Sequence, residues 1–336
     1  MTDATILILE GNRLALARLL TQVENDSPEG RAALAELFPH TGRAHLIGVT
    51  GAPGTGKSSL VNQLALYYRK SENKKVAIVA VDPSSPFTGG AVLGDRVRMR
   101  DLSGDSGVFI RSMASRGSLG GIAQTTAAMA QVFDAAGYEI IIIETVGAGQ
   151  SEVDIARLAH TTLVVEAPGF GDDIQAIKAG ILEIADVLVI NKADRPGVEN
   201  TERALRTTLE LAHPTTRVFR HHGQAMTVPG IVTDSKLWIP PINKTVATEG
   251  KGFAELAESI AKHAEHLRQS GDWTARDRAM LGSEMEALLQ ETLMARFFDT
   301  IQQENYEDVM EKVLNRNLSP YEAVKFLLKG RAKGEK

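Results

Sequence analysis

The sequence predicts an α/β fold: a doubly wound, mostly parallel sheet, preceded by N-terminal helices and followed by a C-terminal helical arm. Three observations lead to this prediction. From Ala44 onward, short apolar stretches alternate with amphipathic ones, as strands and helices do in such sheets. Several of these stretches are apolar throughout, which is expected of strands that helices cover on both faces. After His266 the strand pattern ends and apolar residues recur at helical spacing.

The first segment, residues 1–43, is predicted to be helical. Apolar residues between Ile6 and Val23 recur three and four positions apart, which indicates one helix. Ser27 and Pro28 have the character of an N-cap and a first helical residue, so a second helix is expected from there to about Leu37.

Residues 44–270 are predicted to form the α/β domain. Seven apolar stretches are candidate strands: His45–Thr50, Lys75–Val81, Val108–Arg111, Glu139–Thr145, Thr161–Glu166, Val187–Asn191 and Ile242–Ala247. In a doubly wound sheet, ligands bind at the carboxyl ends of the strands. The residues that follow each stretch are therefore the first candidates for a functional site.

Residues 271–336 are predicted to be a helical arm. A helical stripe extends from Met280 to Leu293, and Ser319, Pro320 and Glu322 resemble an N-cap, a first-turn proline and a capping-box acid. Such a stripe must be buried, either on its own domain or against a second subunit. The stripe is long, which favours a homodimer.

Composition excludes several classes of protein. The 37 basic and 42 acidic residues give a net charge of −5, whereas nucleic-acid binding needs a concentrated basic surface. The chain has no cysteine, which excludes disulfide scaffolds and thiolate metal sites. No apolar run is long enough to span a membrane, and Met1–Glu10 lacks the basic start of a targeting peptide. A cytoplasmic protein without nucleic-acid or membrane partners is expected.

A phosphate-binding loop follows the first predicted strand. Its glycines let the backbone wrap a phosphate closely, and its N–H groups converge on phosphate oxygens. Lys57 would reach the β- and γ-phosphates, and the Ser58 hydroxyl would bind magnesium. The nucleotide-binding residues are predicted to be Gly51, Ala52, Pro53, Gly54, Thr55, Gly56, Lys57, Ser58 and Ser59.

A guanine-reading sequence, Asn191-Lys192-Ala193-Asp194, follows the sixth predicted strand. The Asp194 carboxylate can accept hydrogen bonds from the guanine N1–H and 2-amino groups, which adenine does not offer. Lys192 can lie along the base, and Asn191 can brace the phosphate loop. Ala247 and Thr248 are expected in the loop that closes this pocket. Together the two motifs predict a P-loop GTPase fold of SIMIBI-like type that binds GTP or GDP with Mg²⁺.

Three acids are expected near the γ-phosphate and the metal. Asp82 ends the second predicted strand, Asp95 lies in a glycine-flanked loop, and Glu144 ends a strongly apolar strand. Such acids can bind magnesium or its waters, or orient an attacking water. With Lys57 they are the candidate catalytic residues, although some could be helix caps instead. The Gly147 N–H could sense the γ-phosphate.

Other patterns are less specific. A glycine-rich loop with Asp172 and Lys178 could respond to nucleotide, or could be an ordinary capped loop. The alternating arginines from Arg96 to Arg100 are interpreted as a solvated face. The eight histidines are scattered along the sequence, and the pair His221-His222 is interpreted as part of a surface loop. The region Arg217–Lys236 matches no predicted element.

The motifs together resemble the MeaB/ArgK-type G proteins, the bacterial relatives of the human MMAA protein. The segments that carry the resemblance are the phosphate loop, Val81-Asp82-Pro83-Ser84-Ser85, Gly94-Asp95, Leu119-Gly120-Gly121, Glu144–Glu152 and Asp172–Lys178. It extends over nearly the whole chain, including the leading helices and the tail around Ser319-Pro320-Tyr321.

The resemblance implies a GTPase chaperone of an adenosylcobalamin-dependent acyl-CoA mutase, with methylmalonyl-CoA mutase as the expected client. It implies that the protein gates cofactor loading, protects or reactivates the mutase, and is stimulated by it. It also implies Ser58, Asp82, Asp95 and Glu144 around the metal, a third switch at Asp172–Lys178, and a dimerisation arm.

The sequence fits three other classes of protein less well. A metabolite phosphotransferase would need an acceptor pocket and an arginine-bearing lid. A nickel-delivering GTPase would need cysteine and histidine clusters. A protein-targeting GTPase would need a methionine-rich RNA-binding domain, which nine scattered methionines do not supply. Slow intrinsic hydrolysis is also expected, because no arginine is evidently placed as a finger in cis.

Overall fold

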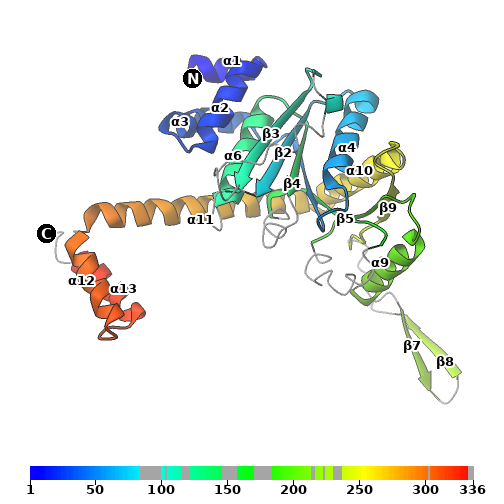
Figure 1. Cartoon of the computed structure of the whole chain (residues 1–336). Helices are drawn as coiled ribbons and strands as arrows, with labels where there is room; N and C mark the ends of the chain where they lie inside the picture. Colours follow the sequence, from blue (N-terminus) through cyan, green and yellow to red (C-terminus); the bar gives the residue numbers. More distant parts are fainter. Residues whose placement is uncertain are drawn as a thin grey trace. The chain divides into compact units, whose positions relative to one another are not determined.

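The structure is a computed structural model that describes residues 1–83, 100–102, 104–115, 121–145, 157–169, 184–212, 216–221, 224–229, 237–301 and 303–331. The chain forms two compact units, Met1–Leu281 and Gly282–Lys336. Each is described on its own. Figure 1 labels most of the helices and strands.

A seven-stranded sheet forms the centre of the first unit. Its strands are β1 His45–Thr50, β2 Val76–Pro83, β3 Val108–Ser115, β4 Ile140–Thr145, β5 Thr161–Glu166, β6 Val187–Asn191 and β9 Ile242–Thr245. They lie in the order β3-β2-β4-β1-β5-β6-β9, and every neighbouring pair is parallel. The doubly wound parallel sheet is thus confirmed, with all seven predicted strands in it.

Helices cover both faces of this sheet (Figure 1). On one face α4 Lys57–Glu72 and α10 Phe253–Ser270 pack on alternate strand residues such as Ile78 and Ile142. On the other, α6 Gly121–Ala135 packs on their neighbours, such as Val79 and Ile143, and α9 Val198–Ala212 packs on Leu188 and Ile190. Burial on both faces explains why several strands, such as β4 and β6, are apolar along most of their length.

The N-terminal segment contains three helices: α1 Asp3–Leu9, α2 Arg13–Glu24 and α3 Pro28–Leu37, followed by the short η1 Phe38–His40. The prediction of one helix from Ile6 to Val23 was wrong. The chain turns at Gly11, whose φ is +86°, and the Asn12 side chain then caps α2 by accepting from the Leu14 and Ala15 N–H groups. The Ser27 cap is confirmed, since its Oγ accepts from the Gly30 N–H at 3.0 Å.

A hairpin lies in the region that the sequence left unassigned. Strands β7 Thr216–His221 and β8 Gln224–Pro229 pair antiparallel. His221, interpreted above as part of a surface loop, is instead the last residue of β7. In the sequence, the pair His222-Gly223 lies between the two strands, and a glycine in such a pair is a hairpin signal. The short strands with few aliphatic residues gave too weak a pattern to detect.

The first unit ends within α11 Asp272–Thr300, and the second continues with α12 Gln303–Leu314 and α13 Pro320–Arg331. The capping box at α13 is confirmed: the Ser319 Oγ accepts from the Glu322 N–H, and the Glu322 carboxylate accepts from the Ser319 N–H. Helices α12 and α13 pack together through the buried Val309 and Ala323.

The second unit exposes many large apolar side chains. On α11 to α13 these are Met285, Leu288, Leu289, Leu293, Met294, Phe298, Met310, Leu314, Tyr321, Val324, Phe326 and Leu328. Across the residues that the structure describes, no helix combines the length and apolarity needed to cross a membrane.

Candidate nucleotide site

The candidate site lies at the carboxyl edge of the sheet, where parallel strands of this fold present their loops. The phosphate loop connects β1 to α4, Glu144 stands near the end of β4, and Asn191 ends β6. Since β1 lies between β4 and β5, and β6 follows β5, these residues gather at one edge of the sheet.

The glycines of the phosphate loop are required by its geometry. Gly51 has a φ of +140°, and a Cβ there would lie 2.2 Å from the Val165 carbonyl oxygen. Gly56 has a φ of +91°, and a Cβ there would lie 2.5 Å from the Asn191 Nδ2. Both distances are too short for any other residue. The loop thus follows the sheet edge closely, with Pro53 and Gly54 exposed at its tip.

Lys57 opens α4, and its side chain returns over the loop. Its Nζ donates to the Gly51 carbonyl at 2.8 Å and to the Ala52 carbonyl at 3.2 Å. The residue is 6% exposed. Its ammonium therefore lies inside the ring of loop carbonyls, within reach of phosphates that the loop would surround.

Ser58 and Glu144 are brought together from two elements. The Ser58 Oγ donates to the Glu144 Oε1 at 2.7 Å, and Glu144 is 5% exposed. A hydroxyl and a carboxylate beside a phosphate loop are hard oxygen donors of the kind magnesium prefers. The described side chains contain no group of three or more acids, histidines or cysteines able to hold a metal. Magnesium commonly takes only one or two protein ligands beside substrate phosphates, so these two residues fit it.

Asn191 joins the two predicted motifs into one structure. Its Nδ2 donates to the Thr55 carbonyl at 2.9 Å and the Gly56 carbonyl at 3.3 Å. Its Oδ1 accepts from the Thr245 hydroxyl at 3.2 Å and from the Ala247 N–H at 3.3 Å. The residue is 1% exposed. One amide thus connects the phosphate loop, the end of β6 and the loop after β9.

Lys192 and Asp194 extend from this centre toward the surface. The Lys192 backbone is left-handed, with a φ of +57°, and its Nζ donates to the Gly54 carbonyl at 2.5 Å. Asp194 is exposed. The ion pair with Glu249 and, to a smaller extent, the charge of Asp194 raise the pKa of the Lys251 ammonium. The charge of Asp194 thus reaches Lys251, whose backbone pairs with Val246, the residue before Ala247 and Thr248.

The sequence missed Thr245, which is 1% exposed and donates to Asn191. Its carbonyl also accepts from the Ala193 N–H at 3.0 Å. The only signal in the sequence was a threonine at the end of a predicted strand, and threonine is common in strands because it packs well there.

Several predicted residues lie outside the described part of the chain. These are Asp95, Gly147, the loop Asp172–Lys178, His222 and the arginines Arg96 and Arg98. Asp82 is placed only by its backbone, which pairs with Ala114 near the end of β2. Their contribution to the site stays a prediction.

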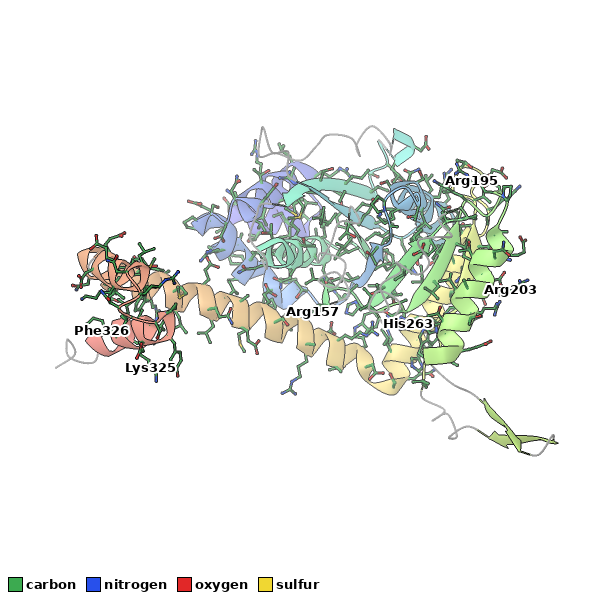
Figure 2. All side chains as sticks on the ribbon, turned by 60° about the horizontal axis from the view of Figure 1, so that its bottom comes forward. Arg157, Arg195, Arg203, His263, Lys325 and Phe326 are labelled. Atoms are coloured by element: carbon green, nitrogen blue, oxygen red, sulfur yellow. The ribbon has the colours of Figure 1, made fainter. Side chains whose placement is uncertain are left out.

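Figure 2 shows the side chains of the described residues. Arg195 and Arg203 point outward from the region of α9, and both are exposed. His263, by contrast, lies inside the first unit and is 1% exposed.

Comparison with known proteins shows the family to which the chain belongs. The family model described as methylmalonyl-CoA mutase-associated GTPase MeaB matches residues 16–302. A protein of Pyrococcus abyssi named as a GTPase is 42% identical over 95% of this chain and 93% of its own length. The mitochondrial methylmalonic aciduria type A homolog of Caenorhabditis elegans is 30% identical over 86% of this chain and 72% of its own.

Among solved structures, one titled LAO/AO transport system kinase superposes with a TM-score of 0.69 at 26% identity. The match covers 98% of this chain and 97% of that chain, so the likeness includes the whole fold. With the family model matching most of the sequence, the chain belongs to the MeaB family, the GTPases associated with methylmalonyl-CoA mutase.

Proposed function

We propose that this GTPase is a chaperone of an adenosylcobalamin-dependent acyl-CoA mutase, with methylmalonyl-CoA mutase as its client. In this proposal GTP binding and hydrolysis gate the loading of the cobalamin cofactor and the reactivation of the mutase. The observation that carries the nucleotide part is the Asn191 amide, which ties the phosphate loop to the guanine box. The name of the family carries the mutase part.

The phosphate end of the proposed site uses Lys57, Ser58 and Glu144. Lys57 releases the Gly51 and Ala52 carbonyls and pairs with the β- and γ-phosphates. Ser58 and Glu144 hold Mg²⁺, with Asp82 and Asp95 completing its surroundings. Bound magnesium would neutralise charge on the phosphate oxygens during transfer to water. A carboxylate of this group orients the attacking water, and the Gly147 N–H reports the γ-phosphate.

The base end of the proposed site discriminates guanine from adenine. Asp194 accepts from the guanine N1–H and 2-amino groups, and each such charged hydrogen bond contributes about 1.5–3 kcal/mol. Adenine would leave this carboxylate unpaired. Lys192 covers one face of the base, and the backbone at Ala247 and Thr248 closes the pocket next to Asn191.

The second unit is proposed to be a dimerisation arm. Its helices α11 to α13 expose the apolar side chains described above, among them Leu289 at 55%, Leu293 at 52% and Phe326 at 59%. Exposed apolar surface on this scale indicates a protein contact. A second copy of the same arm would bury it in a homodimer.

The test measures phosphate release from GTP by the purified chain, alone and with apo methylmalonyl-CoA mutase, with ATP as the control nucleotide. We expect slow turnover of GTP that the mutase accelerates, because a partner that orders the catalytic loops raises such rates by large factors. Rapid turnover of the chain alone would contradict the switch. Indifference to this mutase would direct the search to other acyl-CoA mutases.

A phosphotransferase is the second candidate, because the solved relative is titled a transport system kinase. The two functions differ in the fate of the γ-phosphate. Radiolabelled γ-phosphate that appears in a small metabolite faster than in inorganic phosphate would establish the kinase and reject the chaperone.

A further inference from the structure

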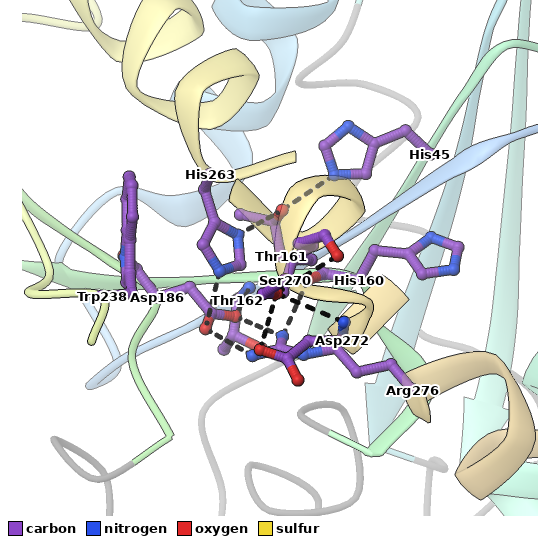
Figure 3. Close-up of polar contacts among 11 residues, drawn as sticks. His45, His160, Thr161, Thr162, Asp186, Trp238, His263, Ser270, Asp272 and Arg276 are labelled. Carbon is purple, nitrogen blue, oxygen red and sulfur yellow. Dashed lines mark hydrogen bonds and ion pairs between the residues drawn. The ribbon is translucent and has the colours of Figure 1, made fainter. Parts of the chain in front are cut away.

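A polar cluster lies at the amino ends of β5 and β6, at the opposite edge of the parallel sheet from the phosphate loop. Figure 3 shows its polar contacts. We call it the Asp186 cluster; it comprises His160, Thr161, Asp186, His263, Arg276 and Asp277. Thr161 opens β5, and Asp186 immediately precedes β6. His263 comes from α10, while Arg276 and Asp277 come from the start of α11.

Asp186 is the centre of this cluster. Its two carboxylate oxygens accept from the Arg276 guanidinium at 2.8 Å each, and its Oδ1 lies 3.2 Å from the His263 Nε2. It also accepts from the Thr162 N–H at 2.8 Å. Burial alone would raise the pKa of Asp186, but the hydrogen bonds from Arg276 and His263 outweigh it and lower that pKa to about 2. Side chains of α10 and α11 thus stabilise the buried Asp186 carboxylate just before β6.

One face of α11 contacts the residues at the amino ends of β5 and β6. Trp273, Arg276 and Asp277 are three and four positions apart, and therefore lie on the same side of the helix. Trp273 stacks on His160 with ring centroids 4.0 Å apart, and Asp277 Oδ1 lies 2.8 Å from the His160 Nε2. Arg276 also donates to the His160 carbonyl at 2.7 Å. The first turns of α11 thus bind His160, just before β5, and Asp186, just before β6.

The Thr161 hydroxyl connects His263 of the cluster to His45. Thr161 Oγ1 lies 2.9 Å from the His263 Nδ1 and 2.8 Å from the His45 Nε2, and its single proton serves one ring at a time. Burial holds the pKa of His45 well below its usual value, so that ring is neutral. Because the His263 Nε2 donates to Asp186, the Nδ1 of the singly protonated ring accepts from the Thr161 hydroxyl, and the His45 Nε2 then donates to the Thr161 oxygen.

Strand β6 connects this cluster to the nucleotide site. It has five residues, Val187–Asn191, all of them buried, and spans about 16 Å at ~3.3 Å per residue. Asp186 is fixed at one end, and Asn191 binds the phosphate loop and the loop of Ala247 at the other. A shift of β6 along its own axis would therefore move both Asp186 and Asn191.

We propose that the Asp186 cluster couples the start of α11 to the nucleotide site through β6. Guanine nucleotide, by fixing Asn191, tightens the contacts of α11 with Asp186 and His160. By thermodynamic reciprocity, a displacement of α11 weakens nucleotide binding. The helix continues past Gly282 into the second unit, so a partner bound there can change nucleotide affinity. The coupling rests on the proposed guanine-nucleotide binding.

Tryptophan fluorescence can report changes in the Asp186 cluster. The chain contains two, and both contact the histidines of this edge: Trp273 stacks on His160, and Trp238 lies 4.9 Å from the His263 ring. Trp238 also donates to the Asp186 carbonyl at 2.7 Å. Intrinsic fluorescence therefore reports on the Asp186 cluster, at the opposite edge from the nucleotide site.

The experiment titrates the full chain with Mg·GDP, following tryptophan emission and, in parallel, calorimetric heat. We expect a saturable emission change whose midpoint equals the calorimetric Kd. Arg276→Met should abolish the change and weaken binding about tenfold, within the range of allosteric couplings. Arg276→Lys keeps the charge without the planar fork and should restore part of both. The matched control is Arg206→Met, which removes an exposed arginine paired with Glu202 and should resemble wild type.

Each outcome decides the proposal. Should Arg276→Met fail to fold by circular dichroism, Asp277→Asn, which loosens only the His160 contact, takes its place with a smaller weakening. Wild-type binding of GDP without any emission change would overturn the coupling, as would folded variants that bind GDP with wild-type affinity. Absence of heat with the wild type would instead overturn the nucleotide site, and the coupling with it.

Discussion

At the scale of single residues, Asn191 contributes most to the architecture of the site. Its amide satisfies the Thr55 and Gly56 carbonyls in the phosphate loop and accepts from Thr245 and Ala247. Asn191 therefore fixes the phosphate loop against the end of β6 and the loop after β9.

We predict that Asn191→Ala weakens GDP binding about tenfold to a hundredfold. Loss of a buried hydrogen-bonding partner costs roughly 1–3 kcal/mol, and 1.4 kcal/mol is about a factor of ten. Calorimetry measures the change. Asn200→Ala, at an exposed position on α9, is the control and should bind as wild type does. Equal affinities for the two variants would reject the bracing role.

Asp186 gives a pH-dependent prediction. Its pKa is about 2 in the fold against an ordinary 3.8, so its ionised form favours the folded state. The resulting stability is present above pH ~4 and is lost as the pH falls from about 4 to 2; the shift corresponds to about 2 kcal/mol. Urea unfolding at several pH values should therefore show the gap between wild type and Asp186→Asn shrinking by about this amount. A gap that stays constant through that window would contradict the depressed pKa.

Some of these residues could be predicted from sequence and others could not. Lys57, Ser58 and Asn191 belong to short contiguous motifs, so the spacing of residues in the sequence was enough to predict their roles. The eight histidines were interpreted as scattered, yet His45 and His263 both reach Thr161, at 116 and 102 residues of separation. No local pattern contains such a contact, because only the order of the strands creates it.

At the scale of elements, the phosphate loop depends on glycine where backbones approach each other. Gly51→Ala should abolish nucleotide binding and destabilise the fold, because its Cβ would lie 2.2 Å from the Val165 carbonyl. Gly282→Ala is the matched control: it lies inside α11 with nothing within 4 Å of an added Cβ. It should stabilise that helix by about 0.5–1 kcal/mol. Thermal unfolding and GDP calorimetry of both variants check this, and normal binding by Gly51→Ala would refute the loop geometry.

The elements were predicted well where burial is two-sided. Strands β4, β5 and β6 are buried along their whole length, so their apolar runs gave the clearest strand signal. The break between α1 and α2 was missed, since the apolar spacing continues across Gly11 and only the Asn12 cap marks the boundary. The β7–β8 hairpin was missed because its strands carry arginine, histidine, glutamine and threonine among few aliphatic residues.

At the scale of the whole molecule, the exposed apolar arm predicts a homodimer. Twice the chain mass of 36.2 kDa gives about 72 kDa, which analytical ultracentrifugation should find for the wild type. The double variant Leu289→Glu with Leu293→Glu places charges among exposed apolar side chains and should sediment as a monomer that still binds GDP. A wild type that sediments at 36.2 kDa over the micromolar range would reject the dimer.

Reading of guanine by Asp194 is the central claim, and its exchange for asparagine tests it most directly. The measurement is the affinity for GDP, ADP and xanthosine diphosphate, by calorimetry, of wild type and Asp194→Asn. Xanthine carries an oxygen where guanine has its 2-amino group, so an asparagine amide can donate to it while its oxygen accepts from N1–H. The account predicts that wild type strongly prefers GDP over the other two and that the variant prefers xanthosine diphosphate. A wild type that binds ADP as tightly as GDP, or a variant that retains its preference for GDP, would contradict the account.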